Sequence, residues 1–151
     1  MLILLITISF LPFIFVYIDM VRGKTDIFVS KREERRKYYI LTLFSYIMGV
    51  LSLNLIGISA YNILFYAYFI VGLMLFIQNI KYKISIHAAG IAGPTTLLVA
   101  EYDSFYWLLY LVLIPVIWSR LKMKAHSKYQ IISGALTSVI MTYILVLVLK
   151  A

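Results

Sequence analysis

The chain has 151 residues, of which 64% are hydrophobic and only 13% are charged. Soluble domains carry roughly 25% charged residues, so the composition excludes an ordinary soluble protein and predicts a single integral membrane domain over 1–151. The absence of cysteine excludes disulfides, thiolate metal sites and cysteine nucleophiles. The formal net charge of +8 does not indicate nucleic acid as a partner, because basic residues beside membrane spans set topology or meet anionic lipid headgroups.

Apolar segments divide the chain into six predicted transmembrane helices, since a span needs about 20 apolar residues. We therefore expect an all-α, six-helix membrane bundle. The spans run roughly over 1–20, 38–58, 61–80, 86–100, 105–118 and 129–149. The first segment has neither a basic stretch at its start nor a small-residue cleavage site, which predicts a retained helix rather than a cleaved signal.

The fourth and fifth segments are short and carry Pro94 and Pro115. Both features predict kinked or half-buried helices in the interior of the bundle. Pairs of small residues at helical spacing, which would let another helix approach closely, lie in the fourth segment: Ala89 with Gly93, and Gly90 with Pro94.

With six spans, three loops share one face of the membrane: 21–37, 81–85 and 119–128. Thirteen of the fourteen lysine and arginine residues lie on that face, and only Lys150 lies on the other, with Glu101 and Asp103. The positive-inside rule then predicts a cytoplasmic basic face and both termini outside. A phosphate site would gather cations on whichever face it occupied, so that explanation of the charge also stays open.

Both histidines, His87 and His126, fall on the basic face. Either they are interfacial side chains that reach toward headgroups, or they belong to a site together with Arg120. The six carboxylates all lie near the ends of spans: Asp19, Asp26, Glu33, Glu34, Glu101 and Asp103. Proton-coupled carriers use carboxylates within the membrane, and magnesium sites use clustered ones. We therefore expect chemistry based on histidine, arginine and lysine without a protein-built metal site, which suits a phosphoryl group.

Three polar stretches resemble, in order, the signatures of the type 2 phosphatidic acid phosphatase (PAP2) superfamily of membrane phosphatases. The third signature, S-R-x5-H-x3-D, is matched by "SRLKMKAHSKYQ", which contains Ser119-Arg120, His126 and Gln130. The second, P-S-G-H, is matched by "ISIH", with Ser85 and His87 in register. The variants "KISIHAAG" and "KAH-x3-Q" look like a prokaryotic branch of the superfamily.

The first signature, K-x6-R-P, is matched only loosely, by "KTDIFVSKREERRK". Six residues separate Lys24 from Lys31, so lysine holds the arginine position, with Arg32 next and Arg35 three residues further on. The resemblance implies that Lys24 and one or more of the other three bind phosphate.

The resemblance also implies a mechanism without cofactor or metal. His126 would attack phosphorus and form a phosphohistidine, and His87 would protonate the leaving alkoxide and then deprotonate water. Arg120 and Ser85 would hold phosphate oxygens. The substrate would be a lipid phosphate or diphosphate, polyprenyl or glycerolipid, that enters from the bilayer.

Gln130 departs from the family pattern, which has aspartate there. At spacing i, i+4 its amide oxygen can orient His126, but it brings no negative charge. Ile86 also replaces the glycine of the second signature. The alternative function is therefore a catalytically silent PAP2-like protein that acts as a membrane subunit or lipid-binding partner. The sequence pattern specifies neither the lipid nor the oligomeric state.

Overall fold

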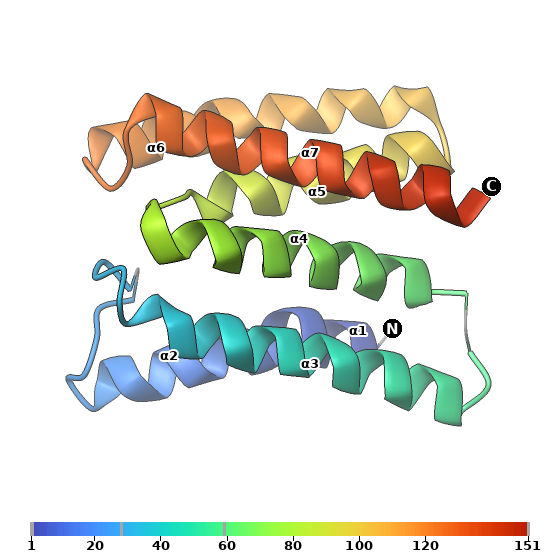
Figure 1. The fold of residues 1–151 in the computed structure, drawn as a ribbon, viewed down its shortest axis with the longest axis horizontal. Helices are drawn as coiled ribbons and strands as arrows, with labels where there is room; N and C mark the ends of the chain where they lie inside the picture. Colours follow the sequence, from blue (N-terminus) through green and yellow to red (C-terminus); the bar gives the residue numbers. More distant parts are fainter. Residues whose placement is uncertain (1, 28, 59, 151) are drawn as a thin grey trace. The chain divides into compact units, whose positions relative to one another are not determined.

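The computed structural model describes residues 2–27, 29–58 and 60–150, and every regular element in these ranges is a helix (Figure 1). The all-α prediction is therefore confirmed. The elements are α1 (Leu2–Leu4), η1 (Leu5–Phe10), α2 (Leu11–Val21), α3 (Arg35–Leu55), α4 (Asn62–Lys81), α5 (Ile86–Glu101), η2 (Ser104–Val112), α6 (Leu113–Lys122) and α7 (Lys128–Lys150). The first three are consecutive parts of one helix, and η2 and α6 form another.

Five helices of the described residues are long and apolar enough to cross a membrane: Leu2–Val21, Arg35–Leu55, Asn62–Lys81, Ser104–Lys122 and Lys128–Lys150. The second begins and ends three residues before its predicted limits, because the basic residues from Arg35 are helical and the chain turns at Gly57. The fourth predicted segment forms α5, but its 16 residues extend about 24 Å, less than the roughly 30 Å hydrocarbon core. The structure thus has five membrane-length helices where the sequence predicted six.

The contacts of the chain divide it into two compact units, where the sequence analysis expected one domain. The first unit runs to Phe76 and the second begins at Ile77, so that the boundary falls within α4.

In the first unit, α3 packs antiparallel against α4. The ring of Tyr39 lies 5.7 Å from that of Phe76, and the rings of Tyr46 and Tyr68 lie 5.6 Å apart. Next to these pairs, the ring of Phe65 fills the space where a side chain at position 49 would lie, which explains Gly49. The core of this unit consists of Tyr46, Leu53 and Phe65, against which Ile3, Leu4, Ile8, Val50, Tyr68 and Phe69 pack.

The first helix widens to π geometry over Leu5–Phe10, which ends two residues before Pro12. Proline has no N–H to donate to the preceding turn, and its ring clashes with the carbonyl four residues earlier, so the helix must deviate there. Ser45 Oγ of α3 donates to the carbonyl of Thr7 within the widened segment. This hydrogen bond within the widened segment anchors the first helix to α3.

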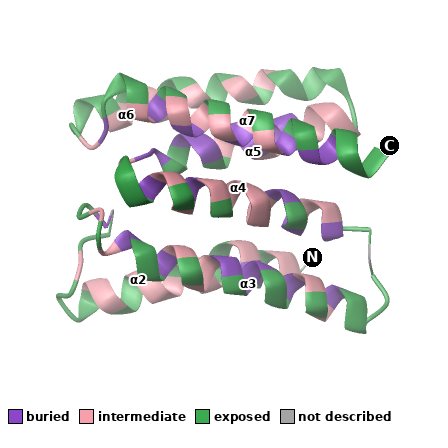
Figure 2. Cartoon of the chain, viewed as in Figure 1, coloured by how far each residue is buried: buried purple, intermediate pink, exposed green. Residues whose placement is uncertain are grey.

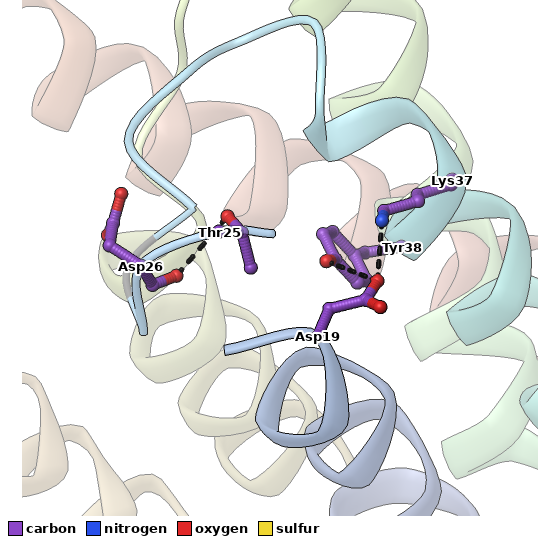
Figure 3. A network of polar contacts seen from close by, with 5 residues as sticks. All are labelled: Asp19, Thr25, Asp26, Lys37 and Tyr38. Carbon is purple, nitrogen blue, oxygen red and sulfur yellow. Dashed lines mark hydrogen bonds and ion pairs between the residues drawn. The ribbon is translucent and has the colours of Figure 1, made fainter. Parts of the chain in front are cut away.

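A polar cluster joins the end of α2 to the start of α3 (Figure 3). Asp19 accepts hydrogen bonds from Lys37 Nζ at 2.5 Å and from the hydroxyl of Tyr38 at 2.9 Å. Both partners come from the first turn of α3, so the carboxylate ties the end of α2 to the start of α3.

In the second unit, α5 and α7 pack parallel to each other, and their buried residues follow the shared face (Figure 2). Near their starts, the backbone N–H of Ser85 donates to the carbonyl of Gln130 at 3.1 Å. Near their ends, Lys150 Nζ lies 3.2 Å from a carboxylate oxygen of Glu101. Lys150 and Glu101 therefore lie at the same end, as the sequence predicted.

Small residues bring α5 and α7 close together. Ser138 Oγ donates to the carbonyl of Ala89 at 2.8 Å, and it occupies the space that a side chain at Gly93 would need. The expectation for the Ala89 and Gly93 pair is confirmed. For Gly90 it is wrong, because Gly90 is exposed and has open space where a side chain would lie.

The fifth predicted span is a 3₁₀-helix, η2, that continues into α6, and none of its residues is buried. The expectation that it lies half-buried in the interior is therefore wrong, and its exposed apolar side chains suit contact with lipid. A 3₁₀-helix rises about 2.0 Å per residue, so η2 and α6 together extend about 33 Å, enough to cross the hydrocarbon core. Thr96 Oγ1 of α5 and the hydroxyl of Tyr110 lie 2.7 Å apart and hold η2 in place.

Candidate functional site

The candidate site lies where α5 and α7 begin side by side. Ser85 precedes α5 as its N-cap, and its Oγ accepts from the N–H of Ala88 at 3.4 Å. Ser85 is fully buried, and its own N–H donates to the carbonyl of Gln130. The second sequence signature is thereby bonded directly to the last residue of the third.

Gly134 makes this close approach possible. A Cβ at Gly134 would overlap the carbonyl oxygen of Ser85 and lie 3.1 Å from its carbonyl carbon. These are backbone atoms, which cannot rotate away, so only glycine lets α7 pass this close to the start of α5. The role of Gly134 could not be predicted from the sequence, because nothing in a single glycine indicates which backbone it faces.

Gln130 contacts both His126 and Ser127 of the third signature. Its Oε1 lies 3.2 Å from His126 Nδ1 and also accepts from the backbone N–H of Ser127 at 3.1 Å. In return, the backbone N–H of Gln130 donates to Ser127 Oγ at 3.3 Å. This reciprocal pair is a capping box, S-x-x-Q, at the start of α7. The predicted contact between Gln130 and His126 is thus present.

Ser127 is the residue that the sequence analysis missed. Its signal was readable, since serine followed three residues later by glutamine, just before an apolar run, is a helix-start pattern. The sequence analysis treated Gln130 only as a substitute for aspartate and did not predict that it also caps α7 with Ser127.

His87 and Arg120 lie on segments that lead to this junction. His87 is exposed in the first turn of α5, two residues after Ser85, and follows the exposed Ile86. Arg120 lies in the last turn of α6 and is half-buried, whereas His126 is 7% exposed.

A tight turn connects Arg120 to the segment that carries His126. The N–H of Ala125 donates to the carbonyl of Arg120 at 3.1 Å, and that of Lys124 to the carbonyl of Leu121 at 3.0 Å. This is a Schellman motif, in which the residue at Lys124 takes a positive φ, here +50°. Glycine is usual at such a position, and Gly23 and Gly57 take it after α2 and α3. Lysine keeps a positive charge at the site at the cost of strain in the backbone.

Positive charge dominates this end of the second unit. Of the seven lysine and arginine residues of this unit, only Lys150 lies at the other end, and six lie in the segments around the junction: Lys81, Lys83, Arg120, Lys122, Lys124 and Lys128. Apart from the chain terminus, the carboxylates of the sequence after Ile77 are Glu101 and Asp103, at the far end of the 16-residue α5. The positive ends of the α5 and α7 dipoles also point here. The junction therefore attracts anions.

The residues of the first signature lie in the first unit. Lys24 is exposed after α2. Lys31 Nζ lies 3.3 Å from Glu34, and an Arg32 nitrogen lies 3.4 Å from Glu33. Arg35 is buried, and its Nε donates to the carbonyl of Val29 at 2.8 Å, so part of its guanidinium serves to fold the loop. A phosphate-binding role for these four residues stays a prediction.

Among the described residues, no three histidine, aspartate or glutamate side chains come close enough together to hold a metal ion. No protein-family model, curated protein or solved structure matches the chain.

Proposed function

We propose that the protein is a metal-independent membrane phosphatase that hydrolyses a lipid phosphate or diphosphate, polyprenyl or glycerolipid, through a phosphohistidine. One observation carries the proposal. At the junction, Gln130 joins a buried histidine to the capped start of α5, in segments rich in lysine and at the opposite end of α5 from Glu101 and Asp103. This combination suits a histidine nucleophile and a phosphate electrophile, since cations and helix starts stabilise the negative charge.

In the first step of the proposed reaction, Nε2 of His126 attacks phosphorus while the bond from phosphorus to the lipid oxygen breaks. His87 gives its proton to the leaving alkoxide. In the second step, water attacks the phosphohistidine and passes a proton to His87, which releases inorganic phosphate and restores both histidines. Arg120 and the backbone N–H groups of the helix starts stabilise the phosphate oxygens in both steps.

The proposed setting is a PAP2-like arrangement in which α5, though short, serves as the sixth membrane segment. The site would face the cytoplasm by the positive-inside rule, with both termini on the other side. The lipid chains would lie against the exposed apolar surface of the helices, and the phosphate would lie at the basic end.

A second candidate function is a catalytically silent protein that binds lipid phosphate. It is favoured by the capping box, because the hydrogen bonds of Gln130 with Ser127 and Ser85 are explained by the capping of α7 and its packing against the start of α5, without any reaction.

Purified protein in detergent with EDTA tests the two functions. Incubated with phosphatidic acid or a polyprenyl phosphate, it should release inorganic phosphate, and His126→Ala should abolish the release. Tyr129→Ala is the matched control, since Tyr129 is exposed in the same segment and should retain activity. Binding of the lipid without release would favour the silent protein, and release that requires Mg²⁺ would contradict the mechanism.

A further inference from the structure

The hydrogen bonds at the start of α7 determine which atom Gln130 presents to His126. A glutamine amide has one accepting oxygen and one donating nitrogen. The backbone N–H of Ser127 can only donate, so the atom 3.1 Å from it must be the oxygen. The same oxygen lies 3.2 Å from His126 Nδ1. Because this oxygen can only accept, Nδ1 must carry a proton, and in the neutral ring the other nitrogen, Nε2, then has the lone pair.

Ser127 holds this arrangement through its side chain as well. Its Oγ accepts from the N–H of Gln130 at 3.3 Å, which closes the turn and keeps the N–H of Ser127 directed at the amide oxygen. Without this lock, the amide could rotate by half a turn and present its nitrogen to the imidazole. The ring would then take the opposite tautomer, with its lone pair on Nδ1.

We infer that Ser127 is a positioning residue, which through the capping box selects the Nδ1–H tautomer of His126 and so leaves Nε2 ready to attack phosphorus. The inference rests on the proposed function for its consequence in catalysis, but the tautomer itself is measurable without any reaction. A carboxylate at position 130 would present an oxygen in either orientation. The lock is thus required because this chain has an amide there.

Nitrogen-15 NMR of the imidazoles in the full chain, in detergent at pH 9 where ordinary imidazoles are neutral, tests the inference. The chain has two histidines, so His87→Asn assigns the signals and His87 serves as the internal reference. We expect His126 to be mainly Nδ1–H in the wild type. In Ser127→Ala the ratio of tautomers should fall by about fivefold to tenfold, as expected for the loss of one cap. Ser127→Thr keeps the hydroxyl and should retain the wild-type ratio.

Two further variants separate the lock from a general loss of structure. Gln130→Met removes the acceptor at similar size and should lose the preference even if Ser127→Ala does not fold. In the double variant Ser127→Ala with Gln130→Glu, the carboxylate should restore the Nδ1–H form. An Nε2–H form in the wild type, or an unchanged ratio in folded Ser127→Ala, would overturn the inference; if Ser127→Ala does not fold, an unchanged ratio in Gln130→Met would overturn it. The expected tautomers without phosphate release would support the lock and contradict the proposed phosphatase.

Discussion

Gly134→Ala tests whether the contact between α7 and the start of α5 builds the site. The new methyl group would overlap the carbonyl oxygen of Ser85, so the two helix starts must separate. The hydrogen bond from the N–H of Ser85 to the carbonyl of Gln130, now 3.1 Å, would lengthen or break. Gly90→Ala is the matched control. Gly90 is also a helical glycine, in α5, but a Cβ there would meet no other atom within 4 Å.

Gly134→Ala loses stability through overpacking and a broken hydrogen bond, and gains some through helix propensity. Overpacking costs about 1–3 kcal/mol and the lost hydrogen bond about 1 kcal/mol. Alanine regains up to about 1 kcal/mol of helix propensity at either position. Gly134→Ala should therefore destabilise the protein by about 1–3 kcal/mol, whereas Gly90→Ala should be neutral or slightly stabilising. A displacement of about 1 Å at the site would lower phosphate release on the order of 100-fold.

The loss of stability is measured by thermal unfolding in detergent, followed by the fluorescence of Trp107 and Trp118. The loss of activity is measured as phosphate release at a temperature where both variants are folded. Both tryptophans belong to the second unit. Gly134→Ala should melt below the wild type and below Gly90→Ala. If it melts with the control and keeps its activity, the reasoning from the close backbone contact is refuted.

Three other substitutions have expected outcomes. Lys124→Gly places glycine at a position with positive φ, where glycine is not strained, and should raise the free energy of unfolding by about 0.5–1 kcal/mol. It also removes a positive charge near the site and should lower phosphate release. A lower melting temperature in thermal unfolding would show that the backbone at Lys124 is not strained. Tyr110→Phe removes the hydroxyl 2.7 Å from Thr96 Oγ1 and should cost about 1 kcal/mol by the same measurement, and an unchanged melting temperature would show that this bond does not hold η2. Arg35→Ala removes the donor to the carbonyl of Val29, so trypsin should cleave the segment 22–34 about tenfold faster while cleavage within 122–128 stays constant; equal rates in the first segment would contradict the buried role of Arg35.

The sequence predicted helices well where apolar runs were long and ended at recognisable residues. The run after Lys128 gave α7 to within one residue at each end, and Ile86–Glu101 was predicted equally closely. It failed where proline changed the type of helix. Pro12 and Pro115 follow π and 3₁₀ segments, respectively, and hydropathy does not distinguish these geometries because an apolar run predicts a span whatever the number of residues per turn.

Within the site, the contact of His126 with Gln130 was predicted from i, i+4 spacing on a helix face, but it forms for another reason: His126 lies before α7, and the cap with Ser127 folds the amide of Gln130 back toward it. The meeting of Ser85 with Gln130 was predicted only as a common membrane face. Their hydrogen bond depends on Gly134 and on the parallel packing of α5 and α7, and a sequence without a partner helix in view specifies neither.

Detection of the phosphohistidine tests the central claim most directly. Protein mixed with lipid phosphate in EDTA is quenched in alkali, where phosphohistidine survives, and its peptides are examined by mass spectrometry. The account predicts one added phosphoryl group on the peptide that contains His126, and none in His126→Ala. Phosphate release without any phosphorylation of His126 would contradict the account.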